Sequence, residues 1–296
     1  MAEIETKEEL PEGQKENTFI NADNVKIYCK YWYPKEDIKA LVHIIHGLGE
    51  HCARYDALAE SFNKLGCLVF GHDHIGHGRS GGARVDVTAF QKYVADCNQH
   101  IDIVTKDHPD LPIIIFGHSM GGTIAILLMN SAPEKYAGGI FMSPATKLSG
   151  VQGSSAAIYM GELMARMSPH MPIGQLDISN LSRDPAVVEH YVKDPLVWHG
   201  KVKARLAVNV AKACRKIQAE CNKATYPFLL LHGTKDKLCI IEGSDLFAKK
   251  AASQRKVYKR YEGYYHELEK EPEGEREVVF KDIEEWTKEI LSSIKS

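Results

Sequence analysis

The sequence predicts an α/β protein in which a helical cap is inserted into a mostly parallel, doubly wound sheet. Short apolar runs alternate with segments of helical periodicity along most of the 296-residue chain, as strands and crossover helices do in parallel sheets. The run at 41–45 is apolar on both faces and ends at His46-Gly47, which is typical of a buried parallel strand. Residues 151–223 show no convincing strand, and a loop of that length would be anomalous. They are therefore interpreted as a cap of helices.

The predicted elements follow one another within a single domain over residues 18–296. Residues 1–17, with six Glu and two Lys, are expected to form a flexible, solvated acidic arm. An Asn-Ala-Asp-Asn turn before an alternating segment predicts a hairpin over 21–33. Further strands are expected at 41–45, 67–70, 113–116, 139–143, 226–231 and 257–261, and helices at 55–64, 90–106, 121–130 and 278–294, with the cap at about 151–223.

Composition excludes several classes of protein. Hydrophobic residues make up 44% and charged residues 26%, unlike a disordered, collagen-like or coiled-coil chain. A net charge of −2 supplies no positive field, so we expect no nucleic-acid partner. No apolar run reaches the ~18–20 residues that cross a bilayer, the first residues do not resemble a signal peptide, and the seven cysteines form no CxxC pair. We therefore expect a cytoplasmic protein with reduced thiols.

The segment Gly-His-Ser-Met-Gly at 117–121 carries the clearest chemical signal. This G-x-S-x-G pattern follows the apolar run at 113–116 and precedes a helix-forming stretch, which is the strand–turn–helix context of a nucleophile elbow. Glycines are needed because the turn is too tight for larger side chains beside the nucleophile. The alternative, a phosphate-binding turn, lacks the P-loop lysine. The pattern therefore predicts Ser119 as a nucleophile.

A serine nucleophile needs a histidine base, and the histidine needs a carboxylate that orients it. With this elbow the chain order is Ser, then Asp or Glu, then His. Asp236 follows the apolar strand at 226–231, where ligand-facing groups gather, whereas Asp245 lies within an apparent helix and is the weaker choice. His266 is the only histidine after Asp236 and follows the next strand. The predicted triad is therefore Ser119, His266 and Asp236.

Two backbone N–H groups are expected to bind the oxyanion that forms during attack. One belongs to Met120, directly after the nucleophile. The other is assigned to Leu48, because the His-Gly-Leu-Gly loop follows an early strand and its small residues let the backbone approach the substrate.

The histidines at 72, 74 and 77 raise a metal-dependent hydrolase as a competing interpretation. Their H-x-H-x-x-H spacing resembles the metal-binding H-x-H-x-D-H of metallo-β-lactamase-like hydrolases. Gly76 replaces the aspartate, and no distant ligand set is apparent. We therefore favour a structural loop near the site, and predict neither a metal ion nor a cofactor.

The chain resembles the monoglyceride lipase family over roughly residues 18–290, through five segments in that family's order: HGLGEHCARY, FGHDHIGHGRSGG, FGHSMGG, HGTKDKLC and YEGYYHELEKE. The resemblance implies the α/β-hydrolase fold and hydrolysis of long-chain monoacylglycerols to glycerol and fatty acid through an acyl-enzyme. It implies the same triad and oxyanion donors, and a glycerol pocket that includes Glu50, Arg54, His118 and Tyr191. A lysophospholipase or another lipid carboxylesterase is the alternative, and a complete triad argues against a non-hydrolytic binding protein.

Three positions depart from the family pattern. Vertebrate members have cap cysteines where this chain has Trp198 and Arg205, and a histidine where it has Glu269. Cys239, near the predicted triad, is kept. These departures leave thiol-reagent sensitivity and the detailed glycerol contacts open.

The cap sequence combines a methionine-rich stretch with a basic one. Met160, Met164, Met167 and Met171 are almost regularly spaced, which fits either core packing or an adaptable apolar entrance for acyl chains. Residues 199–218 contain no acid and hold six basic residues: Lys201, Lys203, Arg205, Lys212, Arg215 and Lys216. Such a run is either an ordinary solvated face or a surface that attracts anionic membrane. We expect peripheral membrane contact through the cap, whereas oligomeric state and acyl-chain preference are not predicted.

Overall fold

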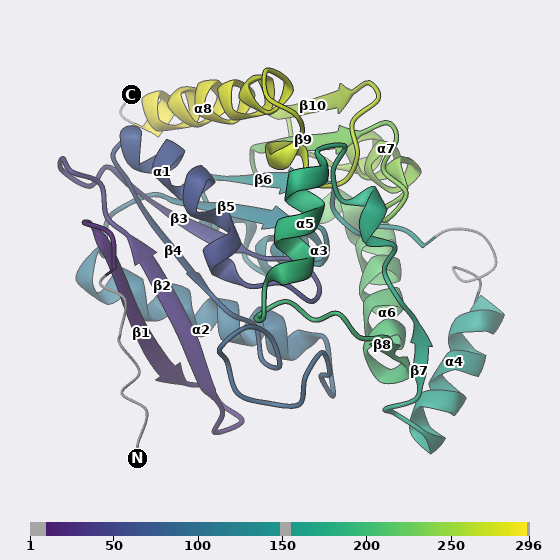
Figure 1. Ribbon diagram of the computed structural model, residues 1–296. Coiled ribbons are helices and arrows are strands. Elements are labelled where there is room, and N and C mark those ends of the chain that lie inside the picture. The colour runs from purple at the N-terminus through teal and green to yellow at the C-terminus, as the bar shows by residue number, and fades with distance from the viewer. Residues whose placement is uncertain (1–9, 149–154, 295–296) are drawn as a thin grey trace, which may run out of the picture.

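The computed structural model describes residues 10–148 and 155–294, which include an eight-stranded sheet in the order β1-β2-β4-β3-β5-β6-β9-β10 (Figure 1). The strands are β1 (Gln14–Ile20), β2 (Lys26–Trp32), β3 (Ala40–Ile45), β4 (Cys67–His72), β5 (Ile113–His118), β6 (Gly138–Met142), β9 (Phe228–Gly233) and β10 (Lys256–Tyr261). β2 pairs antiparallel with β1 and with β4, and all other neighbours are parallel. The predicted mostly parallel sheet is confirmed.

The central strands are buried along their whole length, because helices cover both faces of the sheet. Every residue of β3, β4, β5, β6 and β9 is buried. Helices α2 (Gln91–Asp107), α3 (Met120–Ser131) and α7 (Ile241–Lys250) form a hydrophobic core against one face, and α1 (Asp56–Lys64) and α8 (Glu275–Ile294) form one against the other. The parallel strands end at one edge, so the loops after them meet there.

The structure shortens the expected N-terminal arm. Residues 14–17, assigned to the arm, belong to β1, which pairs with β2 along all seven of its residues. The segment is polar and mostly exposed, so backbone hydrogen bonds rather than apolar side chains hold it at the sheet edge. A search for apolar periodicity therefore misses it. Residues 1–9 lie outside the described part of the chain.

The segment between β6 and β9 supplies the cap. Its elements are α4 (Ser155–Met167), β7 (Pro172–Gly174), a 3-10 turn at Ile178–Asn180, α5 (Pro185–Lys193), β8 (Val202–Lys203), α6 (Ala204–Glu220) and a second 3-10 turn at Cys221–Lys223. The expectation that this segment has no strand was wrong, because β7 and β8 pair antiparallel. They are three and two residues long, too short for a periodic pattern. In Figure 1, α4 lies far from the sheet, at the right of the molecule.

Two cap segments are fixed to the loops of the core by backbone hydrogen bonds. The carbonyl oxygen of Leu181 accepts the N–H groups of His266 and Glu267, at 3.1 and 2.7 Å. The N–H of Trp198 donates to the carbonyl oxygen of Gly49 at 2.7 Å. These contacts place the cap beside both loops that the sequence singles out.

Candidate active site

Ser119 lies at the sharp turn between β5 and α3. Its φ of 55° and ψ of −120° form a conformation that a residue other than glycine adopts only when its surroundings enforce it. The flanking glycines permit this turn: a Cβ on Gly117 would lie 2.5 Å from the carbonyl oxygen of Gly121, and a Cβ on Gly121 would collide with the carbonyl oxygen of Ile45. The turn presents the hydroxyl at the start of α3, where the helix dipole favours negative charge.

Asp236 and His266 meet on the loops that follow β9 and β10. His266 Nδ1 lies 2.7 Å from Asp236 Oδ2, and both side chains are buried. Asp236 Oδ1 accepts the backbone N–H groups of Leu238 and Cys239. Burial alone would raise the pKa of Asp236, but the facing His266 and neighbouring His232 hold it well below its ordinary value. Asp236 therefore stays ionised and orients His266, leaving Nε2 to accept a proton.

Ser119 and His266 line one cavity at the carboxyl edge of the sheet. Ser119 Oγ contacts Cys239 Sγ at 3.8 Å and makes no hydrogen bond to His266, although the structure describes both residues. Catalytic hydrogen bonds are often long without substrate and tighten when it binds. The structure thus places Ser119 and His266, the latter paired with Asp236, on the same cavity, and the triad itself stays a prediction.

Leu48 and Met120 border the same cavity beside Ser119. Met120 is the first residue of α3, so its N–H has no partner within the helix. The bond from Trp198 to Gly49 holds the loop that carries Leu48. Both predicted oxyanion donors therefore lie where the nucleophile would act.

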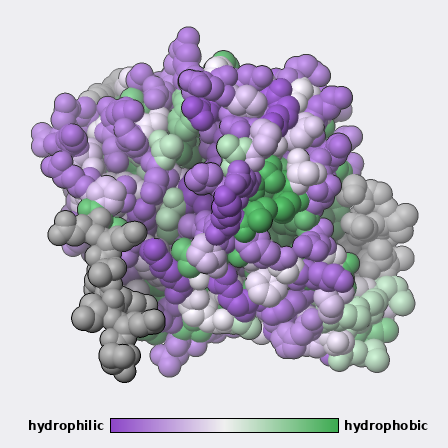
Figure 2. Space-filling view, in the orientation of Figure 1, coloured by the Kyte–Doolittle hydropathy of each residue, from purple (hydrophilic) through white to green (hydrophobic). Residues whose placement is uncertain are grey.

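The cavity lining divides into a polar and an apolar group. The polar side chains beyond the triad are Glu50, His118, Tyr191 and Glu267. The apolar side chains are mainly Leu148, Leu176, Leu181, Val210 and Leu238. Figure 2 shows apolar surface gathered between α5 and α6, and more of it on α4 at the lower right. This lining suits a ligand with a small polar head and a long apolar tail.

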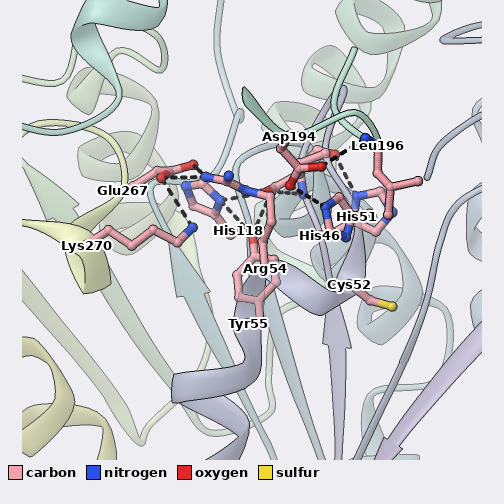
Figure 3. A network of polar contacts seen from close by, with 12 residues as sticks. His46, His51, Cys52, Arg54, Tyr55, His118, Asp194, Leu196, Glu267 and Lys270 are labelled. Atoms are coloured by element: carbon pink, nitrogen blue, oxygen red, sulfur yellow. Dashed lines mark hydrogen bonds and ion pairs between the residues drawn. The ribbon is translucent and has the colours of Figure 1, made fainter. Parts of the chain in front are cut away.

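A buried ionic network lies behind the polar group (Figure 3). Arg54 donates to Glu50 Oε2 at 3.0 Å and to the two carboxylate oxygens of Glu267 at 2.8 and 2.9 Å. Lys270 Nζ lies 3.2 Å from Glu267 Oε2. Burial alone would raise the pKa of Glu267, but Lys270 and Arg54 stabilise the carboxylate and lower its pKa to about 2. The network keeps two carboxylates ionised inside the protein.

Tyr55 links this network to His118. Its hydroxyl lies 2.7 Å from Glu50 Oε1 and 2.9 Å from His118 Nδ1. A hydroxyl has one proton, which the carboxylate attracts, so His118 Nδ1 donates to the tyrosine oxygen. Burial alone would lower the pKa of His118, but the nearby Glu50 carboxylate raises it above its ordinary value. Glu50 thus fixes the orientation of a histidine that lines the cavity.

Arg54 lies behind the lining of the predicted glycerol pocket, in contact with residues that form it. Glu50, His118 and Tyr191 border the cavity as predicted, whereas Arg54 is not among the described residues that line it. Its guanidinium lies 4.8 Å over the ring of Tyr191 and binds the carboxylates from behind. The sequence analysis missed Glu267, although its position next to His266 could have indicated it.

The three departures from the family pattern occupy different surroundings. Glu269 is buried, with Oε1 3.1 Å from Lys270 Nζ. Arg205 binds the carboxylate of Asp86, which is fully buried, through two hydrogen bonds of 2.8 and 2.5 Å. Trp198 holds the loop of Leu48. Two of the three therefore connect the cap to the core.

The histidines at 72, 74 and 77 do not share one site. The rings of His74 and His77 pack against His46, with centroids 4.0 and 5.5 Å apart, and His74 N–H donates to His46 Nε2. His72 Nδ1 instead lies 3.1 Å from His100 Nδ1. The loop thus packs beside the His-Gly-Leu-Gly loop, as the structural interpretation predicts.

The methionine stretch of the cap lies largely on the surface. Met160, Met164 and Met167 are 55%, 45% and 81% exposed, so core packing is the wrong interpretation for them. Other exposed apolar side chains of this part of the cap are Tyr159, Leu163 and Ile173. They form the apolar cap surface, which we define by these six residues.

Basic residues of the cap bind partners in other segments of the chain. Arg205 binds Asp86, Lys203 Nζ donates to the carbonyl oxygen of Arg84 at 2.6 Å, and Lys212 Nζ lies 2.9 Å from Glu162 Oε1. The acids absent from 199–218 are supplied by other segments. The run is therefore not a uniformly free basic face.

Comparisons with known proteins identify the family of the chain. Residues 36–273 match the family model described as Serine aminopeptidase, S33. The chain is 39% identical over 267 residues to a rat monoglyceride lipase, covering 90% of this chain and 88% of the relative. It is 42% identical over 270 residues to a monoglyceride lipase homolog of monkeypox virus, covering 91% and 97%.

A solved structure shows the same architecture. The monoacylglycerol lipase of Paleococcus ferrophilus superimposes with a TM-score of 0.78 at 29% identity, covering 90% of this chain and 98% of that one. In the described part of the chain, no helix is both long and apolar enough to pass through a bilayer.

Proposed function

The chain belongs to the monoglyceride lipase family of α/β-hydrolases, and on this basis we propose that it hydrolyses long-chain monoacylglycerols to glycerol and free fatty acid. The observation that carries this proposal is the divided lining of the cavity at Ser119. The polar group would hold the glycerol hydroxyls, and the apolar group would bury methylenes of the acyl chain, each worth about 0.8 kcal/mol.

In the proposed mechanism, Ser119 Oγ attacks the ester carbonyl while His266 Nε2 accepts its proton. The oxyanion accepts hydrogen bonds from the N–H groups of Leu48 and Met120. As the carbon–oxygen bond to glycerol breaks, His266 returns the proton to the glycerol oxygen, leaving an acyl-enzyme. Water then gives a proton to His266 and attacks the acyl carbon. As the bond from the acyl carbon to Ser119 Oγ breaks, His266 returns that proton to Oγ, which releases the fatty acid and restores both residues.

Within this proposal the polar residues have separate tasks. His118 and Glu50 border the cavity and would bind glycerol hydroxyls, with Tyr191 closing the same side. His118, with Lys270 and Arg54, lowers the pKa of Glu50, and Lys270 and Arg54 lower that of Glu267, so both carboxylates stay ionised. No step of the mechanism requires a cofactor.

Peripheral contact with a membrane through the apolar cap surface belongs to the same proposal. Flexible methionine side chains suit contact with lipid, and an amphiphilic substrate resides in a membrane. All seven cysteines are unpaired, which fits a reducing, cytoplasmic location. Charge reversal at the exposed Lys201 and Lys216 should then weaken sedimentation with anionic phospholipid vesicles, most visibly at low salt. Unchanged sedimentation of that variant would argue against an electrostatic contribution.

A substrate panel tests the function. Among mono-, di- and triacylglycerols and lysophospholipids that carry the same acyl chain, monoacylglycerol should be hydrolysed fastest. Ser119→Ala should abolish both this activity and fluorophosphonate labelling. Preference for lysophospholipid would replace the proposal by the alternative esterase. Labelling without turnover of any of these lipids would place the substrate outside this class.

A further inference from the structure

Three buried histidines converge on the α2 side of the sheet. His43 lies on β3, His72 ends β4, and His100 lies on α2. Each offers a ring nitrogen, and these three atoms lie within 4.8 Å of one another. All three residues are at most 1% exposed. None of them lines the cavity at Ser119.

The nitrogens of this cluster lack the partners that buried polar atoms normally have. Both ring nitrogens of His43 and Nε2 of His72 have no hydrogen-bond partner among the described residues. Most buried polar side-chain atoms in proteins are paired, so three unpaired nitrogens in one cluster require an explanation. His43 stands in an otherwise apolar strand and stacks on Phe70, 4.6 Å between centroids, where any aromatic residue would pack as well.

The remaining contacts bear on which nitrogen of His100 can offer a lone pair. His100 Nε2 lies 3.0 Å from the hydroxyl of Tyr31. If Nε2 carries the proton and donates it there, Nδ1 of His100 keeps a free lone pair, 3.1 Å from Nδ1 of His72. A hydrogen bond from the second ring nitrogen to a neighbour is how proteins orient metal-binding histidines.

We propose that His43, His72 and His100 bind a single late transition-metal ion, best matched by monovalent copper. Ligand nitrogens at about 2 Å from a metal in a three-coordinate plane are about 3.5 Å apart, so small side-chain rotations would close the site. Imidazole suits copper and zinc, whereas magnesium and calcium require oxygen ligands.

The surroundings favour an ion of low charge. Aromatic rings of Phe19, Tyr31 and Phe70 border the cluster. No carboxylate of the described residues belongs to the group. The cost of burying an ion rises steeply with its charge, so a neutral, carboxylate-free site favours a monovalent over a divalent ion. The bound ion would join β3, β4 and α2 without touching the reacting atoms.

Metal retention by the purified full-length protein tests this site. Metal-stripped protein is incubated anaerobically with cuprous ion buffered by bicinchoninate, and separately with zinc or magnesium, then desalted and analysed for metal content. The wild type should retain one copper per chain and no magnesium, with a thermal midpoint raised by several degrees. X-ray absorption should show only nitrogen neighbours at about 2 Å.

His43→Phe is the decisive variant, because phenylalanine preserves the packing on Phe70 and removes the ligand. It should retain less than a tenth of the wild-type copper at wild-type esterase activity, which also shows that it is folded. His190→Phe, at an exposed histidine of the cap, is the matched control and should retain copper like the wild type.

Three results would overturn the proposal. Equal copper in His43→Phe and wild type, or none in either, would remove the site and leave a buried water as the partner of these nitrogens. Copper–sulfur scattering would place the ion on the cysteines. Retention of zinc without copper would overturn the assignment to cuprous ion.

Discussion

The buried ionic network behind the cavity and the outer helix of the cap, α4, contrast in which side chains they bury and which they expose. In the network, Arg54, Glu50 and Glu267 are charged yet buried, and each is held by at least one other member. On α4, Met160 and Met167 are apolar yet exposed. Burial of charge fixes atomic positions, whereas exposed flexible apolar side chains leave a surface able to adapt. We therefore assign the positioning of the polar cavity wall to the first region, and selection among substrates to the second.

The largest expected effect belongs to Ser119, which lines the cavity in front of the ionic network. Ser119→Ala should lower kcat by roughly 10⁴–10⁶-fold, because the nucleophile acts only in the chemical step. The thermal midpoint should not fall, since the exchange leaves the turn glycines in place. Steady-state kinetics on monoacylglycerol and calorimetry measure the two quantities. Activity within tenfold of wild type would remove Ser119 from the mechanism.

Arg54→Leu tests whether the buried network is structural. Removing one partner leaves the buried Glu50 and Glu267 with less compensation, so the free energy of unfolding should fall by about 3–5 kcal/mol. Lys281→Leu, which removes an exposed pair with Glu285, is the matched control and should change it by roughly 0.5 kcal/mol or less. Urea unfolding measures the free energy of unfolding of both variants. Equal losses in the two variants would refute this distinction between buried and exposed ion pairs.

Glu267→Gln tests the network through pH. The pKa of Glu267 is about 2 in the folded protein and 4.5 ordinarily. The ionised Glu267 therefore contributes fully to the stability of the folded protein above pH 4.5, and this contribution is lost as the pH falls toward 2. The variant should be less stable than wild type at neutral pH, by on the order of 3 kcal/mol, and the difference should shrink in that acidic window. Unfolding followed at several pH values measures this convergence.

The control for that measurement is Glu262→Gln, at an exposed position near β10. Its stability should follow the wild type across the whole range. A constant difference between Glu267→Gln and wild type from pH 7 to 2 would contradict the assigned ionisation.

The smallest expected effect belongs to the cap. Replacing Met160, Met164 and Met167 together by Ser should lower turnover of long-chain monoacylglycerol about tenfold and spare p-nitrophenyl acetate, because only the long chain needs apolar contacts. Val278→Ser, at an exposed apolar residue of α8, should change neither rate. Equal slowing of both substrates would assign the methionines to structure instead.

The sequence analysis predicted the parts of the fold that depend on local pattern. The buried strands at 113–116 and 226–231 are apolar throughout, and the elbow has fixed neighbours, so both are recognisable without knowledge of distant contacts. The edge strand β1 and the pair β7–β8 are held by backbone pairing to another segment. Their side chains carry no periodic signal, so they were missed.

In the candidate site too, residues fixed by their position along the chain were predicted, whereas contacts between distant segments were not. The candidate triad residues follow strands in a set order, which position along the chain reveals. The contacts of Arg54 with Glu267 gave no local signal, because they join residues 213 positions apart. Likewise, the basic run at 199–218 gave no sign that Asp86, from another segment, binds Arg205. Long-range electrostatic partners cannot be read from local composition.

The two backbone attachments of the cap limit how the domain can be re-engineered. The carbonyl of Leu181 holds the loop of His266, and the N–H of Trp198 holds the loop of Leu48. A cap transplanted from a relative must therefore supply a carbonyl and an amide proton at these two points, whatever its other residues. Proline at 198 would be incompatible, since it has no N–H to donate. Modular exchange is therefore freest at α4, which makes neither attachment.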